Sequence, residues 1–462
     1  MNQERHDTRR TIDRRTLVRR TGALAGAVAL AGCTGTDGEN RDADDSSDGN
    51  ETDDDVDAVP EIVEVEDPPE AVYVPTHREQ MRMLEPIEDG DVAIAPMLSY
   101  PHPFWIVAGG DEDSVERVEP EEGHGVHMMF TVWDRETGTV LPVDDGAELR
   151  VFQDGERIGS PLSPWTMLSQ EMGFHFGDNV SLPGDGGYTV EVELPALSTR
   201  KTGALEDRLT EATSASFEFE YDEAFREEVV GGVEYLDEEL WGERGALEPM
   251  DHGDHNHEHG DADDHGHEHG DDHSHGDHAD EHDHDDHENA DEHSHDDHEH
   301  ADEHDHAHHE VPYSQLPSVE EYPGTLLRED GADGTEPEDD ADLPRSGDAA
   351  VVATLLESES RLAGDERYLL VSPRTPYNRV PLADATLTAT VEREDGSATD
   401  AVLEQTLDGE YGLHYGADVA AEPGDDVTVS FESPPQVARH QGYETAFLEM
   451  ESLELTVPEE AE

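Results

Sequence analysis

Cysteine and lysine are almost absent from this 462-residue chain, in which Cys33 is the one thiol and Lys201 the one ammonium side chain. A single thiol excludes a disulfide framework and a cysteine metal site. Arginine carries nearly all of the positive charge, against 118 Asp and Glu residues and a formal net charge of −91. Phosphate contacts need basic patches, so nucleic acid is not an expected partner. Such a charge, spread over the whole chain, indicates adaptation to concentrated salt, which screens the repulsion.

An apolar run long enough to span a membrane is missing from the N-terminal region, where the run from Ala23 to Ala31 is too short. It follows Arg14-Arg15 and ends in Leu30-Ala31-Gly32-Cys33, a pattern typical of a twin-arginine export signal closed by a lipobox. We expect residues 1–32 to be this signal, with cleavage before Cys33 and lipid attached to that cysteine. The expected product is an exported lipoprotein anchored to the membrane at the cell surface; an uncleaved anchor is the alternative.

The rest of the chain divides by composition. Residues 33–68 are acidic and lack apolar periodicity, which predicts a disordered stalk. Short runs that alternate apolar and polar residues, separated by Gly, Pro and Asp, predict antiparallel β-sandwiches at 69–240 and 346–459. Residues 241–345 are expected to be a disordered linker rich in His and Asp. The predicted fold class is therefore all-β, with two sandwiches joined by a long linker.

One segment occurs twice. Met172-Gly-Phe-His-Phe-Gly-Asp-Asn-Val180 returns as Tyr411-Gly-Leu-His-Tyr-Gly-Ala-Asp-Val419 at a constant offset of 239 positions, which places His175 on His414. The same offset relates Arg200 to Arg439 and Gly203 to Gly442. We interpret this as an internal duplication of one domain. The two copies could pack as a pseudo-dimer within one chain.

Histidine is concentrated in the linker, where 21 of the 29 histidines fall between residues 251 and 310. Side chains two positions apart in an extended chain point the same way, so each His-x-His pair can hold one ion. Imidazole suits Zn²⁺, Cu²⁺ and Ni²⁺, although acidic filler into which histidine has drifted is the alternative. Candidate ligands in the tract are His255, His257, His259, His265, His267, His269, His304, His306 and His308.

A second group of candidate ligands lies in the predicted sandwiches. Phe174 and Phe176 flank His175, so an extended backbone would send both rings to one face and the imidazole to the other. A histidine with a purely structural role is the alternative for any one of these positions. The candidates are His77, His102, His127, His175 and Met167 in the first sandwich, and His414 and His440 in the second.

The motif from Gly173 to Val180, with the Leu182-Pro-Gly and Tyr188-Thr-Val that follow, resembles the periplasmic iron/copper-binding transport proteins that accompany iron permeases. The resemblance implies an immunoglobulin-like sandwich, often dimeric, in which His175 or His414 binds metal. It also implies a methionine upstream, which Met167 fits, an Arg-His pair, and a ligand from the N-terminal region. Arg439-His440 matches that pair, whereas the first copy has Arg200-Lys201, and His77 or His102 could replace the missing ligand there.

The function we expect is capture or hand-over of a divalent transition metal for uptake, by a non-enzymatic protein with a metal permease as its candidate partner. Fe²⁺ follows from the resemblance, Met beside His suits copper, and Zn²⁺ is a further candidate for the linker. The alternative is a non-catalytic cell-surface structural or adhesion protein of a halophile, with an incidental His tract. No nucleophile-base set or phosphate loop is apparent in the sequence.

Overall fold

The computed structural model describes residues 62–110, 114–142, 146–250, 311–329, 340–393 and 395–459. The expected signal, most of the stalk and the whole tract from 251 to 310 lie outside the described residues. The predictions for Cys33 and for the tract histidines (His255 to His308) therefore fall outside them as well. No helix in the part of the chain that the structure describes is both long and apolar enough to cross a membrane.

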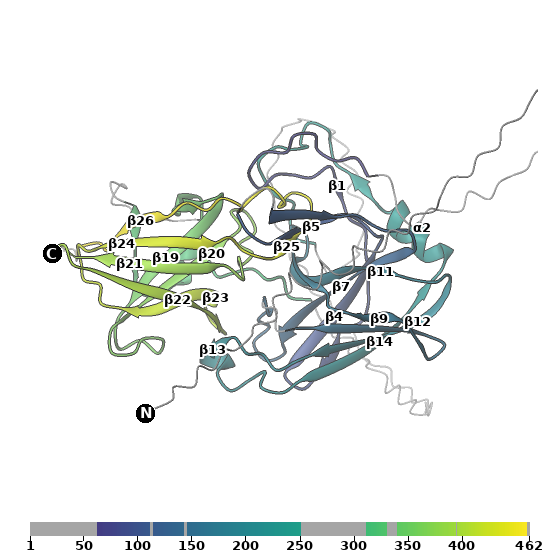
Figure 1. The fold of residues 1–462 in the computed structure, drawn as a ribbon, viewed down its shortest axis with the longest axis horizontal. Helices are drawn as coiled ribbons and strands as arrows, with labels where there is room; N and C mark the ends of the chain where they lie inside the picture. The colour runs from purple at the N-terminus through teal and green to yellow at the C-terminus, as the bar shows by residue number, and fades with distance from the viewer. Residues whose placement is uncertain are drawn as a thin grey trace, which may run out of the picture. The chain divides into compact units, whose positions relative to one another are not determined.

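The prediction of an all-β fold is confirmed, because strands dominate the described residues and the longest helix, α2 (Glu223–Gly231), has nine residues. The first sandwich pairs a nine-stranded sheet with a four-stranded one (Figure 1). The four-stranded sheet has the order β14 (Thr213–Tyr221), β12 (Gly186–Leu194), β8 (Glu148–Gln153), β9 (Glu156–Leu162). The nine-stranded sheet has the order β2 (Arg82–Met83), β4 (Val92–Ser99), β7 (His124–Asp134), β11 (Gly173–Ser181), β10 (Trp165–Ser169), β25 (Ala438–Arg439), β5 (Phe104–Val107), β6 (Val115–Val118), with β3 (Ile87–Asp89) beside β4.

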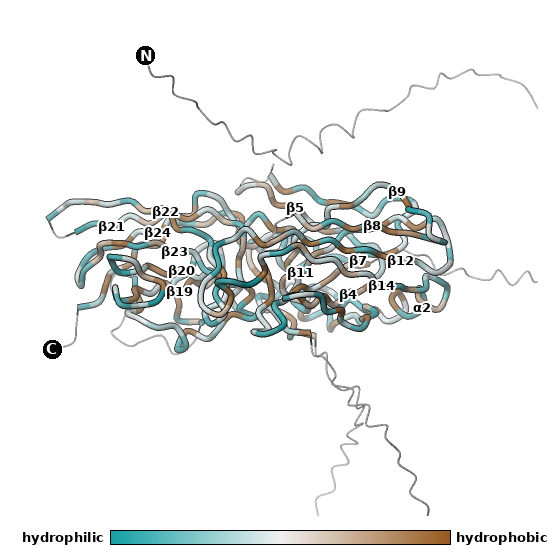
Figure 2. Tube along the Cα trace, turned by 90° about the horizontal axis from the view of Figure 1, so that it is seen from below, coloured by the Kyte–Doolittle hydropathy of each residue, from teal (hydrophilic) through white to brown (hydrophobic). Residues whose placement is uncertain are grey.

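The two sheets of this sandwich differ in burial. Strand β14 alternates buried and exposed residues along its whole length, as one solvated face requires. Strands β4 and β7 are instead buried on both faces. One of their faces packs on the sandwich core, and the other is covered by further parts of the chain. Figure 2 shows brown, hydrophobic stretches along the strands and teal, hydrophilic stretches between them.

The second half forms ten strands of an eleven-stranded sheet that folds over on itself, and the eleventh strand, β13 (Arg200–Thr202), comes from the first half. Strand β22 (Ala398–Asp408) pairs with β23 (Gly412–Val419) along one part of its length and with β21 (Thr386–Glu392) along another, so it belongs to both layers. Val427, Val429, Leu453 and Leu455 are among the buried residues of this core. The strand order is β16 (Thr325–Leu326), β19 (Ala349–Leu356), β20 (Arg367–Arg374), β23 (Gly412–Val419), β22, β21 (Thr386–Glu392), β24 (Asp426–Ser433), β26 (Leu453–Thr456), β17 (Arg328–Glu329), with β18 (Arg345–Ser346) beside β19.

The two halves exchange strands. Strand β25, from the second half, lies between β10 and β5 of the first sandwich (Figure 1). Strand β13 (Arg200–Thr202), from the first half, pairs with β22 of the second. The pairings of β25 with β10 and of β13 with β22 are parallel, and that of β25 with β5 is antiparallel. The main apolar core also contains side chains from both halves, among them Val380, Leu413 and Val437. The described residues therefore belong to one compact unit.

Parts of the stretch assigned to the linker are ordered on this unit. Met250 donates its backbone N–H to the carbonyl of Glu171 at 2.9 Å. On the far side of the tract, Val311 is buried against Trp133, and the Ser314 hydroxyl accepts the backbone N–H of Phe174 at 2.7 Å. The two described ends of the tract are thus both held against the first sandwich, and residues 241–250 and 311–329 are structured rather than free.

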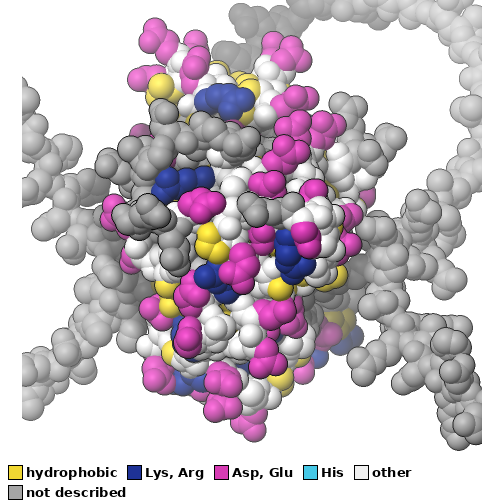
Figure 3. Space-filling model, turned by 90° about the vertical axis from the view of Figure 1, so that its left-hand side faces the viewer, with side chains coloured by type: hydrophobic (Ala, Val, Ile, Leu, Met, Phe, Trp, Pro, Cys, Tyr) yellow, Lys and Arg dark blue, Asp and Glu magenta, His cyan; other side chains and the backbone are white. Residues whose placement is uncertain are grey.

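The surface carries the acidic excess as scattered side chains. On the face in Figure 3, Asp and Glu are spread among a few arginine groups, without a single acidic or basic patch. Many arginines on the described surface contact carboxylates, as Arg226 contacts Asp185 and Arg367 contacts Glu357. Spread charge of this kind is solvated and screened by salt, and it defines no binding face by itself.

Candidate metal centre

Histidine side chains from three parts of the fold meet on the outer face of the nine-stranded sheet. His127 is on β7 and His175 on β11, while His102 lies in the loop between β4 and β5. The exchanged strand β25 adds His440, because His440 directly follows it and donates its backbone N–H to the Leu168 carbonyl at 3.0 Å. Four histidines distant in sequence are therefore close neighbours. The His440 ring centroid lies 4.8 to 5.6 Å from those of the other three, and the His102 and His127 centroids are 4.1 Å apart.

Strand alternation explains how β11 presents its histidine. Phe174 and Phe176 point into the sandwich core, where Phe176 stacks on Phe130 at 5.1 Å between centroids. The His175 imidazole takes the opposite face and is fully buried there. Gly173 begins the strand with φ = +68°, a conformation that favours glycine, and its carbonyl is the hydrogen-bond partner of the His175 Nδ1 at 3.2 Å.

Each imidazole is held through Nδ1. The Nδ1 atoms of His175 and His102 lie 3.2 Å from the carbonyl oxygens of Gly173 and Pro103. Because a carbonyl oxygen only accepts, each Nδ1 must carry the proton. The His127 Nδ1 lies 3.0 Å from the Asn179 Oδ1, whose orientation is set because the Asn179 Nδ2 donates to the His102 carbonyl at 2.9 Å.

The fourth ring is oriented by a carboxylate. The His440 Nδ1 lies 3.2 Å from an oxygen of Glu79. A neutral imidazole whose Nδ1 donates keeps its Nε2 as a bare lone pair. The His175 and His440 Nε2 atoms lie 3.1 Å apart, and the buried Nε2 atoms of His102 and His127 have no hydrogen-bond partner. Metal-binding histidines have this arrangement: one ring nitrogen donates to an acceptor, and the other ring nitrogen is left free for the metal ion.

A thioether joins these nitrogens. Met167 pairs with His175 across β10 and β11 and is fully buried. A Cβ placed at Gly177 would lie 3.0 Å from both the Met167 Sδ and the His127 Nε2. Both atoms thus converge above Gly177, and the missing side chain there leaves room for them.

Glu79 supplies the only carboxylate that the structure shows in contact with two of these rings. Its second oxygen lies 3.5 Å from the His102 Nε2. Burial alone would raise the pKa of Glu79, but the imidazoles of His102 and His440 lower this pKa well below its usual range. Glu79 is therefore an anion beside the four rings.

Burial disfavours the charged form of three of the four imidazoles. Burial lowers the pKa of His102 to about 4 and that of His175 to about 3, and it lowers the pKa of His127 well below the usual range. A neutral ring can bind a metal ion without first losing a proton. Among the described residues, the group of His, Cys, Asp or Glu with metal-ligand spacing is His102, His127 and His440, whose ligand atoms lie within 4.8 Å of one another.

The sequence candidates divide into those inside and those outside this centre. His102, His127, His175, His440 and Met167 come together. His77 lies apart from these rings, in a small cleft that Glu79 and His440 also line. Its ring faces Tyr235 at 6.1 Å and its Nδ1 contacts the Thr76 hydroxyl at 3.0 Å. Glu79 was missed, because one carboxylate does not stand out among 118 acidic residues; its spacing to His77 in His77-Arg-Glu79 was the available signal.

His414 lies in a different environment in the second half. Its cross-strand partner is Thr406, at the position that Met167 holds opposite His175. Tyr368, which pairs with Asp418, takes the position that His127 holds opposite Asn179. The Tyr368 hydroxyl lies 3.4 Å from the His414 Nε2, and the Arg200 guanidinium lies 5.7 Å from the centre of the Tyr368 ring. This position therefore offers a hydroxyl and a cation where the first half offers a thioether and imidazoles.

The exchanged strands show which residue replaces the fourth histidine. Arg439 faces Leu168 of β10, and Lys201 faces Leu407 of β22, so the two strands superpose with Lys201 on Arg439. Thr202 then takes the position of His440, and its hydroxyl donates to Asp408 at 2.6 Å. The equivalence from the structure is shifted by one residue from the sequence alignment, which had placed Lys201 on His440.

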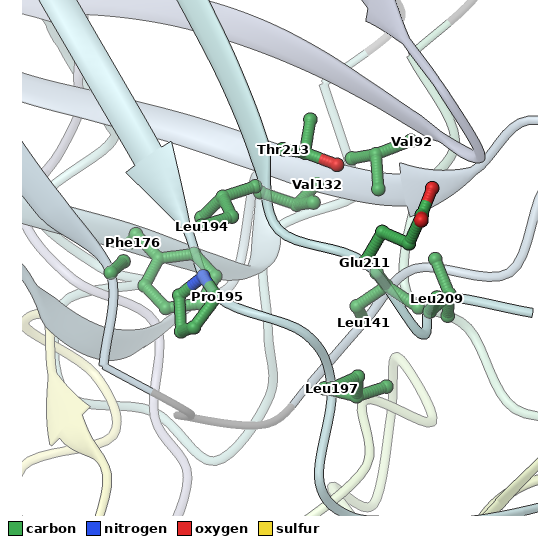
Figure 4. A pocket seen from close by; sticks show the side chains of 11 residues that line it. Val92, Val132, Leu141, Phe176, Leu194, Pro195, Leu197, Leu209, Glu211 and Thr213 are labelled. Carbon is green, nitrogen blue, oxygen red and sulfur yellow. The ribbon is translucent and has the colours of Figure 1, made fainter.

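An apolar pocket elsewhere in the first sandwich is unrelated to the centre. Val132, Phe176 and Leu194 line it, and Glu211 is the charged side chain at its edge (Figure 4). No histidine or methionine lines this pocket, so it offers no metal ligand beyond that carboxylate.

Comparisons with known proteins match separate parts of the chain. Residues 320–456 match the family described as Domain of unknown function (DUF7350). The search of curated proteins gave no match. Among solved structures, a copper-bound variant of FetP from uropathogenic Escherichia coli is 16% identical with a TM-score of 0.22, covering 31% of this chain and 97% of that chain.

Two further structures are similar at the same level. FetP as isolated from its recombinant host is 18% identical with a TM-score of 0.23, over 31% of this chain and 96% of that chain. A copper-bound variant of P19 from Campylobacter jejuni is 19% identical with a TM-score of 0.21, over 25% of this chain and 91% of that chain. Each of these matches covers less than a third of the present chain.

Proposed function

We propose that this chain is an exported, non-enzymatic metal-binding protein that captures or hands over a transition metal ion, copper foremost, for uptake. The observation that carries the proposal is the convergence of the Nε2 atoms of four histidines: those of His102 and His127 are buried without a hydrogen-bond partner, and those of His175 and His440 face each other at 3.1 Å. Burying such lone pairs without partners is costly, and a bound metal ion would satisfy them together. Met167 and the Glu79 carboxylate complete the ligand set.

The ligand types favour copper. Imidazole nitrogens with one thioether form a mixed set of borderline and soft donors, which suits copper better than Ca²⁺ or Mg²⁺. Glu79 adds an anionic oxygen that also suits Fe²⁺, so iron is the second candidate cargo. Zn²⁺ is the candidate for the His-x-His pairs of the tract, which would bind it loosely because separate short pairs share no common scaffold.

The proposed setting is the outer side of a membrane. Lipid on Cys33 would hold the protein there, and the tract from 251 to 310 would collect ions close to the centre. Support for this placement comes from the sequence of the N-terminal segment and from Met250 and Val311, whose positions on the first sandwich bring both described ends of the tract to the half that holds the centre. A metal permease is the proposed recipient.

The test uses a matched pair of substitutions. In a chain whose residues 252–309 are replaced by a Gly/Ser linker, His175→Ala should weaken Cu²⁺ binding by more than about 100-fold, since even residues that only orient ligands are worth 10–100-fold. His414→Ala, the equivalent change in the other half, should leave Cu²⁺ affinity within about twofold of the parent. Competition with a chelator of known affinity measures both values.

Two results would contradict the proposal. One is a parent protein that binds no stoichiometric Cu²⁺ or Fe²⁺ once the tract is replaced. The other is a greater loss of affinity for His414→Ala than for His175→Ala, which would place the working centre in the second half.

A further inference from the structure

Methionines gather on the same sheet face as the metal centre. Six of the ten methionines in the chain pack into one cluster. Met81, Met97, Met129 and Met172 are buried in it, and Met83 and Met250 pack against them while remaining partly exposed.

Three of these side chains are aligned by strand register. Met83 on β2 pairs with Met97 on β4, and Met97 pairs with Met129 on β7. Directly paired residues share one face of a sheet, with Cβ atoms about 4.5–5.5 Å apart. The three thioethers therefore form a row across the sheet, perpendicular to the strands, which we call the methionine ladder.

The ladder ends at the metal centre. Met129 pairs with Gly177 on β11, and its Cγ lies 3.3 Å from the position of a Cβ on that glycine. The Met167 Sδ and the His127 Nε2 lie 3.0 Å from the same point. The innermost rung of the ladder thus borders two of the ligands. Its outer end is Met83, and Met250, which packs against the same methionine cluster, directly precedes the His tract in the sequence.

Ordinary core packing does not account for this concentration. The main core of the same sandwich is built of Val, Leu and Phe, and Met128 is the one methionine among its buried members. Met128 and Met129 are adjacent on β7 and point to opposite faces, one into that core and one into the ladder. The chain therefore places its methionines on the face that carries the ligands.

We propose that the methionine ladder is a second metal site, one that binds monovalent copper. Thioether sulfur is a soft, neutral donor that selects Cu(I) over Zn²⁺ and Fe²⁺. Met97 and Met129 are buried, and a monovalent ion loses less hydration energy than a divalent ion on entering a buried site. Binding requires no change in the oxidation state of the ion, and it does not depend on which ion the histidine centre holds.

The test follows individual methionine methyl groups in the full chain. With ¹³C-methyl methionine labelling, Ag⁺ serves as a diamagnetic probe, and Cu(I) is added under anaerobic conditions as the natural ion. The ε-methyl signals of Met97 and Met129 should shift on addition of either ion, while the signal of Met128 stays in place. Zn²⁺ should shift none of the three.

Volume-conserving variants serve as controls, since exchange of Met for Leu is well tolerated in cores. Met97→Leu should abolish the Ag⁺-induced shift of the remaining Met129 signal or reduce it to less than half. Met128→Leu should leave the Met97 and Met129 shifts unchanged. Ladder signals that do not respond to Ag⁺ or Cu(I), or a Met128 signal that responds as strongly, would overturn the proposal.

The test of the methionine ladder can fail or succeed independently of the test of the histidine centre. In His175→Ala the ladder should still respond to Ag⁺, although divalent binding at the centre is lost. A ladder that is silent in a protein that binds Cu²⁺ tightly would refute the second site alone, and a responsive ladder without tight Cu²⁺ binding would refute the centre alone.

Discussion

His175 and His414 hold equivalent strand positions, but their surroundings differ. We propose that the first is a metal ligand and the second a structural residue. Both rings bond through Nδ1 to the carbonyl of a glycine two residues earlier, and both are fully buried. Their Nε2 atoms differ, since one faces the Nε2 of His440 and the other a tyrosine hydroxyl. The same backbone motif thus supports a proposed metal ligand in one half and a hydrogen-bonded ring in the other.

The burial of His414 predicts a pH dependence of stability. Burial lowers the pKa of His414 to about 4 in the fold, against roughly 6.5 in the unfolded chain. Between these pH values the unfolded chain binds a proton that the fold excludes, so this histidine makes the free energy of unfolding fall as the pH drops from roughly 6.5 to about 4. Above that window its contribution is constant. The full effect is about 3 kcal/mol.

The comparison is made with His414→Gln, which keeps a donor for the Gly412 carbonyl but does not titrate. Between pH 7 and pH 4 the parent should lose about 3 kcal/mol more than this variant in denaturant unfolding at constant high salt. Burial raises the pKa of Glu171 and of Asp178 to about 7, which has the opposite effect on stability, but both groups are present in both proteins. Parallel stability curves would mean that the pKa of His414 is the same in the fold as in the unfolded chain.

The exchanged strand β25 is the element on which the proposed centre depends. It delivers His440, and its neighbour Arg439 is fully buried with a guanidinium that donates to the carbonyls of Tyr443 (3.3 Å) and Pro435 (3.2 Å), and also to that of Ala446. One side chain thus ties together the turn that follows His440. Arginine suits this role because its planar group donates in several directions at once.

Substitution of Arg439 should therefore weaken metal binding without removing a ligand. Arg439→Lys keeps the charge but cannot reach all of these carbonyls, so the turn loosens and His440 shifts. We expect Cu²⁺ affinity to fall by about 10–100-fold and the free energy of unfolding to fall by about 1–3 kcal/mol, measured by chelator competition and denaturant titration.

Arg374→Lys is the matched control. Arg374 is equally buried, but it lies in the second half and donates to the Pro317 carbonyl at 2.6 Å. This variant should lose comparable stability and keep its Cu²⁺ affinity. Equal affinity losses in the two variants would show that general destabilisation, rather than the position of His440, is responsible.

The described residues form two sandwiches, and each sandwich contributes one strand to a sheet of the other. We propose that they form a pseudo-dimer within one chain, as the repeat at an offset of 239 residues suggests. A ligand from the second half, His440, then completes a centre in the first. The Asn378 side chain supports the contact by donating to the carbonyls of Gln170 and Leu247 across the halves, at 3.1 and 3.0 Å.

Cutting the chain within the tract should leave this assembly intact. After cleavage between residues 251 and 310 by a glutamate-specific protease in molar salt, both halves should elute together from a sizing column and retain tight Cu²⁺ binding. The reason is that strands β13 and β25 and the shared apolar core remain in place. Separate elution of the halves, together with loss of the metal, would contradict the pseudo-dimer.

The sequence by itself determined the all-β class and five of the residues that meet at the centre. Period-two alternation is a local property, so it is readable wherever a strand has one solvated face. The motif around His175 likewise carries its own strand and turn, with Gly173 placed where a positive φ is needed. The methionines were visible too, but each one alone is best explained as core packing.

Only the tertiary structure decided which candidates act together. The exchange of β25 brings His440 within 3.1 Å of His175, although 265 positions separate them, and no local pattern encodes a contact of that range. The same folding leaves His77 outside the cluster of rings, places Tyr368 against His414, and selects Glu79 from a chain crowded with carboxylates. Ligand geometry depends on strand register and on burial on both faces of a sheet, and these arise only when the distant segments pack together.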